Sequence, residues 1–150
     1  MHKRKGRETT LVGVAGVHHV VCELSRRGLI ALPTTRNTAG YDVIVVSQDG
    51  TKHANIQVKS AGNPKVRFWP VAKSKAGIRR GADDYYVFLG GLERGEQIDG
   101  YLLNGKEVLK EIQEHYGDRA FRAGKPFPYC LYLRPRARKQ WAEDWNSWTL

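Results

Sequence analysis

The chain has 150 residues, of which 41% are hydrophobic, and 25 Lys and Arg residues against 15 Asp and Glu residues give it a formal net charge of +10. This length fits one domain with a hydrophobic core, and we expect residues 9–150 to form it behind a basic, flexible arm at residues 1–8. No run of about 18 apolar residues is present, and no apolar segment with a cleavage site follows the basic N-terminus. The composition therefore argues against a membrane protein and predicts a cytoplasmic location.

The excess of positive charge predicts a polyanionic partner. It is concentrated at residues 65–80 and again at 134–139, and a basic surface attracts nucleic acid and speeds its association. An anionic membrane is less favoured, because no basic helix with an apolar anchor face stands out. A basic protein without a nucleic-acid partner is the remaining alternative.

A long first helix is predicted by the apolar spacing after the arm. It begins at Thr9 or Thr10, which can serve as N-caps, and ends at Arg27, where a glycine follows. A short strand at 29–33 and a polar loop at 34–39 come next. The buried stripe of the helix is expected to comprise Val14, Val17, Val21 and Leu24.

Residues 40–60 predict a β-hairpin. Two runs rich in Val and Ile flank the Asp-Gly dipeptide at 49–50, which readily forms a two-residue turn. With that turn, Asp42 faces Gln57 across the strand pair, and Lys59 lies on the same sheet face, two residues further along.

The remaining elements alternate between strands and helices. A helix is expected from 105 to 117, and strands are expected at 85–89, 101–103 and 129–133. One face of a short terminal helix, which we expect to close the core, carries Trp141, Trp145 and Trp148. This order predicts an α/β fold in which helices flank a mixed central sheet.

The polar residues of the hairpin allow two interpretations. Asp is disfavoured in strands, and a buried charge must be paired or bind a metal. In the first interpretation Asp42 and Lys59 form a structural ion pair, with Gln57 as a bystander. In the second, Asp42 and the Gln57 carbonyl bind a hard cation, and Lys59 contacts a phosphate or a water nucleophile.

Further residues are candidates for contact with nucleic acid. Arg36 and Asn37 lie in the loop that leads to Asp42, close to the same end of the sheet. The segment after the hairpin interleaves cations with Phe68 and Trp69, a pattern that grips phosphates and stacks on bases. Trp69 equally suits a core position. The cationic candidates of this segment are Lys65, Arg67, Lys73, Lys75, Arg79 and Arg80.

Three stretches of the chain share a pattern with a known family. They are Gly-Val-Ala-Gly-x-x-x-Val-x-x-Glu-Leu-Ser-Arg-Arg-Gly at 13–28, Arg-Asn-Thr-Ala-Gly-Tyr-Asp-Val-Ile-Val at 36–45 and Ile-Gln-Val-Lys-Ser at 56–60. Together they resemble the PD-(D/E)xK nuclease superfamily. Within it, the chain is similar to a small prokaryotic branch in which Gln replaces the second acidic residue.

The resemblance implies a restriction-endonuclease-like αβββαβ core and hydrolysis of DNA phosphodiester bonds with Mg²⁺ or Mn²⁺. Asp42 and Gln57 would hold the metal, and Lys59 would position the attacking water or steady the developing charge. Ser60 would assist at the margin, in contact with the nucleic acid. The expected substrate is double-stranded or branched DNA, as for enzymes of repair, resolvase or restriction type.

One position departs from the pattern of that branch. A Glu is expected directly after Gly16, projecting from the first helix towards the metal, and this chain has Val17. Asp42 is then the single carboxylate of the site. The sequence leaves two functions open: an endonuclease, of low activity or completed by a carboxylate from a second subunit of a homodimer, or a catalytically impaired nuclease fold that acts as a nucleic-acid-binding or regulatory module.

Overall fold

The computed structural model describes the backbone of residues 2–35, 40–121 and 128–150, and their side chains from Thr9 onwards. The α-helices are α1 (His2–Arg26), α2 (Gly105–Tyr116) and α3 (Pro135–Ser147), and two short 3-10 helices are η1 (Lys75–Gly77) and η2 (Gly117–Arg119). The strands are β1 (Ile30–Pro33), β2 (Val43–Val46), β3 (His53–Ser60), β4 (Phe68–Ala72), β5 (Asp84–Gly90), β6 (Asp99–Asn104) and β7 (Tyr129–Tyr132).

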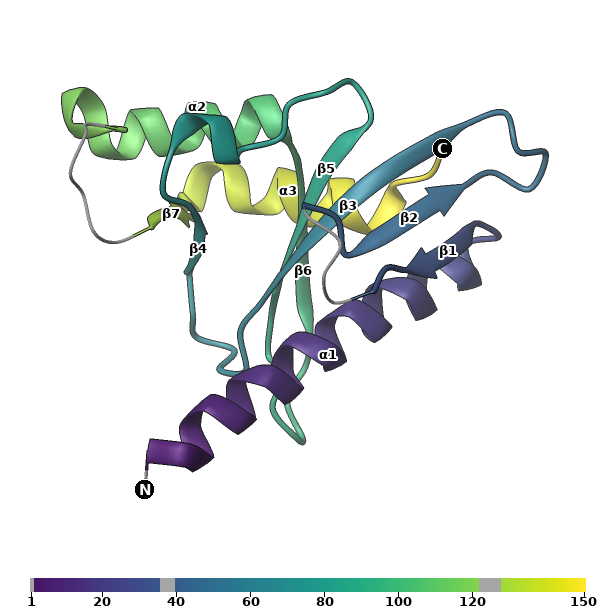
Figure 1. Cartoon of the computed structure of the whole chain (residues 1–150), viewed down its shortest axis with the longest axis horizontal. Coiled ribbons are helices and arrows are strands. Elements are labelled where there is room, and N and C mark those ends of the chain that lie inside the picture. The colour runs from purple at the N-terminus through teal and green to yellow at the C-terminus, as the bar shows by residue number, and fades with distance from the viewer. Residues whose placement is uncertain (1, 36–39, 122–127) are drawn as a thin grey trace.

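Five strands form a mixed central sheet in the order β1-β2-β3-β5-β6. β3 and β5 run parallel, and every other neighbouring pair in this sheet is antiparallel. A separate two-stranded sheet pairs β4 with β7. The prediction of an α/β fold with a mixed sheet and flanking helices is therefore confirmed (Figure 1).

The connection between β3 and β5 differs from the core that the resemblance implies. An αβββαβ order would place a helix between these strands, but residues 61–83 form β4 and the short η1. Parallel neighbours require a crossover connection of a dozen or more residues. Here the crossover contains a strand that pairs with β7, so the second helix of the implied core is not in that position.

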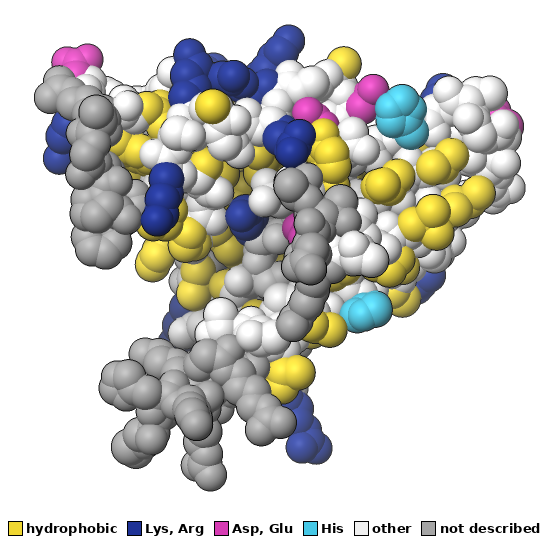
Figure 2. Space-filling model, in the orientation of Figure 1, with side chains coloured by type: hydrophobic (Ala, Val, Ile, Leu, Met, Phe, Trp, Pro, Cys, Tyr) yellow, Lys and Arg dark blue, Asp and Glu magenta, His cyan; other side chains and the backbone are white. Residues whose placement is uncertain are grey.

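Hydrophobic clusters lie on both faces of the central sheet. On one face, α1 and Trp145 of α3 cover buried residues that include Ile56. On the other, α2 and the β4–β7 sheet cover residues that include Tyr86 and Phe88. This second face is open over β1 and β2, where Figure 2 shows hydrophobic side chains at the surface, and the exposed residues there are Ile30, Leu32 and Ile44.

Helix α1 is longer than the sequence predicts. It begins at His2, so residues 2–8 are helical and the predicted start at Thr9 or Thr10 is wrong. It ends at Arg26, and Gly28 follows with a φ of +81°, a left-handed conformation that favours glycine after a helix. The domain boundary at residue 8 stays a prediction. Among the described residues, no helix, α1 included, is both long and apolar enough to cross a lipid bilayer.

The buried stripe of α1 agrees with the predicted one at Leu24, and at Val17 and Val21, which pack against the core, but it includes Val20 in place of Val14. Val20 and Leu24 are fully buried, whereas Val14 is 40% exposed. The reason lies at Gly16, where a Cβ atom would be 1.9 Å from the Oγ of Ser60 on β3. The helix approaches the sheet along the side that carries this glycine, and the residues four and eight positions further on are buried with it.

The β2–β3 hairpin has the predicted register but a longer loop. Val43 pairs with Ile56, as the predicted turn requires. The loop comprises residues 48–51, because the N–H of Ser47 donates to the carbonyl of Lys52 at 3.0 Å. This loop and the predicted two-residue turn share the same centre, so the strand pairing is identical.

Strand β4 is not among the predicted strands, and it contains Trp69. The sequence pattern does not predict this strand because it contains Pro70, and proline is confined to edge strands and strand ends. Trp69 is 1% exposed, and its Nε1–H donates to the carbonyl of Leu89 at 3.0 Å. The core interpretation of Trp69 is correct, and its ring is not available to stack on bases.

The tryptophan face of α3 closes the core as predicted. Trp141 and Trp145 are buried, and Trp148 is partly buried against the same cluster as Trp145. Gly100 on β6 makes room for the helix, since a Cβ atom there would lie 2.4 Å from the indole of Trp145.

Candidate functional site

Asp42 directly precedes strand β2 and is fixed to β3 by two hydrogen bonds. Its N–H donates to the carbonyl of Ile56 at 2.9 Å, and its Oδ2 accepts from the N–H of Val58 at 2.7 Å. The carboxylate oxygen thereby accepts a hydrogen bond from a backbone N–H of β3. If the β2–β3 pairing continued, a backbone carbonyl would accept that bond instead. On the other side, the N–H of Thr34 donates to the Asp42 carbonyl at 2.9 Å. Asp42 is therefore held at the end of the β1–β2–β3 meander.

Gln57 and Lys59 lie on the sheet face away from α1. Their neighbours on β5 are Tyr86 and Phe88, which belong to the core on that face. Burial lowers the pKa of the Lys59 ammonium, and the nearby Asp42 carboxylate opposes that effect. None of the ion pairs among the described residues joins Lys59 to Asp42. The interpretation of a direct structural ion pair is therefore wrong.

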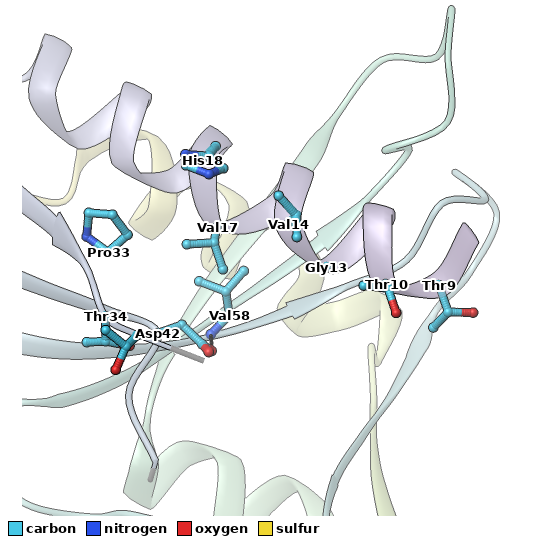
Figure 3. Close-up of a pocket in the computed structure, with 11 residues that line it drawn as sticks. Thr9, Thr10, Gly13, Val14, Val17, His18, Pro33, Thr34, Asp42 and Val58 are labelled. Carbon is cyan, nitrogen blue, oxygen red and sulfur yellow. Dashed lines mark hydrogen bonds between the residues drawn. The ribbon is translucent and has the colours of Figure 1, made fainter. Parts of the chain in front are cut away.

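A cavity of about 400 Å³ opens between α1 and the end of the hairpin. Val17 and His18 line it from the helix, and Asp42 and Val58 line it from the strands. Figure 3 shows Val17 pointing from α1 towards Val58, with Asp42 beside the Val58 backbone. Residue 17 thus shares a cavity with Asp42, and a carboxylate at this position would face the same space.

The oxygen donors near this cavity are few. The described residues contain no group of three or more His, Cys, Asp or Glu side chains that could hold a metal ion. Asp42 lines the cavity and offers its Oδ1, which accepts no hydrogen bond from the described residues, whereas Gln57, whose amide oxygen is a possible further ligand, lies on the sheet face away from α1. Mg²⁺ often takes one or two protein carboxylates and completes its shell with water and substrate phosphate. The donor set fits such a sparsely held ion and does not fit a site built wholly from protein ligands.

The predicted cationic contacts divide into exposed and engaged side chains. Lys65, Lys73 and Lys75 are exposed. Arg67 donates to two backbone carbonyls of its own loop at 2.6 and 2.8 Å, and Arg80 is partly buried. Figure 2 shows Lys and Arg side chains over the part of the surface that holds α2 and β4. The lysines therefore provide the most accessible positive charge of this segment.

Arg79 and Tyr41 form a contact that sequence reasoning missed. The Arg79 guanidinium lies 4.4 Å from the centroid of the Tyr41 ring, and its Nη1 donates to the Tyr41 hydroxyl at 3.1 Å. The backbone N–H of Arg79 donates to the hydroxyl of Tyr86 at 3.0 Å. Tyr41 precedes Asp42, and Tyr86 neighbours Gln57. The contact brings Arg79 to the site, and the sequence signal for Tyr41 is its position beside Asp42.

Ser60 is the one of the remaining predicted contacts that the described residues include, and it is not brought to the site surface. The Oγ of Ser60 is buried beside Gly16 and has no hydrogen-bond partner within the described ranges. Ser60 therefore faces α1, and packing explains its position. Arg36 and Asn37 lie outside the described residues, so their contacts stay predictions.

The basic cluster at 134–139 carries less free charge than the sequence predicts. Arg134 forms ion pairs with Glu111 and Glu114, and Arg136 lies 3.7 Å from Glu114. The hydrogen bonds to Glu111 raise the pKa of Arg134. This arginine ties the segment after β7 to α2, so its role is structural.

No family model matches this chain, and no similar protein was found among curated proteins or among solved structures. The likeness to the PD-(D/E)xK superfamily stays a prediction. Function is therefore inferred from the residues of the site and their geometry.

Proposed function

We propose that this protein binds DNA and hydrolyses its phosphodiester bonds in a metal-dependent reaction at Asp42, Gln57 and Lys59. One observation carries the proposal: burial lowers the pKa of the half-buried Lys59 ammonium and the Asp42 carboxylate opposes that effect, yet the two groups do not form the direct ion pair that a structural role would favour. The Asp42 carboxylate is anchored by a backbone N–H at 2.7 Å. The described residues supply no hydrogen bond to the Lys59 ammonium, which leaves it able to bind an anion.

The chemistry requires a positioned water and positive groups that neutralise the negative charge that develops on the phosphate. In our proposal Lys59 places its positive charge beside the phosphate, and the Gln57 amide orients the phosphate or the attacking water. Arg79, held on the ring of Tyr41, the residue before Asp42, adds a second positive charge to the site. All of these groups are in place before a substrate binds, so the site requires little rearrangement to receive one.

A Mg²⁺ or Mn²⁺ ion would be held by the Oδ1 of Asp42, with the Gln57 carbonyl oxygen as a further ligand. When bound, such an ion supplies a Lewis acid for the phosphate and lowers the pKa of a bound water. Because one carboxylate is a sparse donor set, we expect weak binding of the ion in the absence of DNA.

The proposal is tested by cleavage of linear, single-strand-tailed and four-way-junction DNA with Mg²⁺, with Mn²⁺ and with a chelator. We expect Asp42→Ala and Lys59→Ala to lower the cleavage rate by roughly 100-fold or more, as for other groups that stabilise a transition-state charge. Glu96→Ala removes an exposed acid elsewhere and is the matched control. Cleavage at the parent rate by Asp42→Ala would rule out this site.

Val17 favours a second candidate, a nuclease fold that binds DNA without cutting it. Val17 lines the cavity that Asp42 shares, so the α1 side of that cavity lacks the carboxylate that the resemblance implies. A protein of this kind would act as a binding or regulatory module and would use the same basic surface.

The two candidates are separated by Val17→Glu. If the parent is inert because an acid is missing, Val17→Glu gains Mg²⁺-dependent cleavage. The control variant Leu11→Glu adds an acid at an exposed position of the same helix and should not gain cleavage. Circular dichroism establishes that both variants are folded. An active parent with an unchanged Val17→Glu variant would show that this position does not contribute to the reaction.

A further inference from the structure

The outer face of the β4–β7 sheet carries a stack of three aromatic rings. Phe68 stacks on its cross-strand partner Tyr132, with ring centroids 5.7 Å apart and an interplanar angle of 27°. Tyr132 stacks in turn on His115 of α2, with centroids 3.9 Å apart and an angle of 21°. Their strand neighbours Trp69 and Leu131 point the other way, into the core. The stack therefore lies outside the hydrophobic clusters of the fold.

The stack is open to solvent at both of its outer rings. Phe68 is 49% exposed, and His115 is exposed on α2. Pro70, two residues along β4 on the same face, is exposed as well. Burial normally removes large aromatic side chains from water. An exposed ring that is already aligned with two others can accept a further flat group at little cost in conformational entropy.

Lysines lie before and after the strand that carries Phe68 in the sequence. Lys65 precedes β4, and Lys73 and Lys75 follow it, and all three side chains are exposed. The sequence from 61 to 82 contains no Asp or Glu. The acid beside His115, Glu114, is itself paired with Arg134 and Lys110. The surroundings of the stack therefore suit a polyanion that also carries flat groups.

We propose that this outer face, centred on Phe68, binds unpaired bases, so that the protein recognises DNA in which a duplex adjoins a single strand. This inference rests on the DNA-binding function proposed above and names the structure of the substrate. Stacking of bases on aromatic side chains tolerates any sequence, because every base has a flat face, and lysines that track the backbone add affinity. Bases within a duplex already stack on one another, so the exposed rings distinguish single-stranded from paired DNA.

The test uses a duplex with a single-stranded tail that carries 2-aminopurine, whose fluorescence falls when the base stacks. We expect the full-length protein to bind the tailed duplex more tightly than the blunt duplex and to quench the tail probe. Phe68→Ala should weaken tailed binding by about tenfold, remove the quenching and leave affinity for the blunt duplex unchanged. Phe68→Trp should retain both signals.

Two further variants keep the result interpretable. Leu32→Ala removes another exposed apolar side chain, 53% exposed on β1, and should change neither signal. Tyr132→Leu keeps an apolar residue at the centre of the stack and should lose the quenching even if Phe68→Ala proves unstable. Equal binding of tailed and blunt duplexes, with no effect of Phe68→Ala, would overturn the inference and leave the proposed function standing. Failure of the protein to bind either DNA would overturn both.

Discussion

The two faces of strand β3 carry side chains of opposite character. The face towards α1 is apolar and buried at Ala54 and Ile56, and it ends at the enclosed hydroxyl of Ser60. The opposite face carries Asn55, Gln57 and Lys59, all partly exposed. Because successive side chains of a strand point to opposite faces, one stretch of eight residues serves both purposes.

Strand β3 can hold polar groups in position because its backbone and its other face are fixed. β3 lies between β2 and β5, so its backbone is hydrogen-bonded on both sides. The apolar face supplies the packing that fixes the strand. On the polar face Asn55 donates a hydrogen bond to Asp84 at 3.3 Å, whereas no hydrogen bond within the described ranges holds the side chains of Gln57 and Lys59, so substitutions at these two residues and on the apolar face should have separable effects.

The largest effect is expected when neighbouring residues on the two faces of β3 are substituted separately. Ile56→Ala removes a fully buried side chain and should lower the free energy of unfolding by about 2–5 kcal/mol. Gln57→Ala should change it by no more than about 0.5 kcal/mol, as for an exposed position, while it lowers cleavage. Urea denaturation and the cleavage assay measure both. A large loss of stability in Gln57→Ala would mean that the polar face also supports the fold.

A second prediction concerns the charge next to the polar face. The double variant Lys73→Gln and Lys75→Gln removes two exposed cations, so the slope of log binding constant against log salt should fall by about 2. Fluorescence anisotropy with duplex DNA at several salt concentrations measures the slope. Lys139→Gln, an exposed cation on α3, is the control. An unchanged slope in the double variant would place the DNA on another surface.

A third prediction follows from the burial of Lys59. Because its pKa in the folded protein is below the ordinary 10.5, the unfolded chain binds this proton more tightly. Stability should therefore rise with pH through the interval from the lowered pKa to 10.5. Lys59→Met should stabilise the protein at neutral pH and remove that rise, whereas Lys73→Met should do neither. A lower midpoint of urea unfolding for Lys59→Met would show that the electrostatic attraction of Asp42 outweighs the cost of burying Lys59.

The smallest expected effect lies at Ser60. Its hydroxyl is buried without a partner in the described part of the chain, so Ser60→Ala should raise the free energy of unfolding by about 1 kcal/mol. Cleavage and DNA affinity should stay at the parent level, because the side chain faces α1. A loss of cleavage in this variant would restore the predicted role of Ser60 at the site.

Much of the sheet could be predicted from regular alternation and turn chemistry. The apolar runs around Val43 and Ile56 gave the correct register, even though the loop between them is longer than expected. β4 escaped prediction because Pro70 interrupts its pattern. Val14 was wrongly assigned to the stripe of α1 and Val20 was left out, because the small Gly16 decides which side of the helix approaches β3.

The candidate site was predictable where its residues share one hairpin. Gln57 and Lys59 lie on one face of β3, as the alternation of a strand predicts, whereas their role together with Asp42 stays a prediction. The contact between Tyr41 and Arg79 depends on how the crossover after β3 returns to the sheet, and no local pattern reports that path. The absence of a direct ion pair at Lys59 likewise depends on side-chain packing.

The loop at 48–51 offers a place to attach reporters. Strand pairing in the hairpin depends on the centre of this loop, so residues added symmetrically about Asp49 and Gly50 leave Asp42 opposite the same part of β3. A pair of cysteines or a short peptide tag inserted there would sit at the far end of the strands from the candidate site. Such an insertion would allow single-molecule tethering without disturbing the groups proposed to meet DNA.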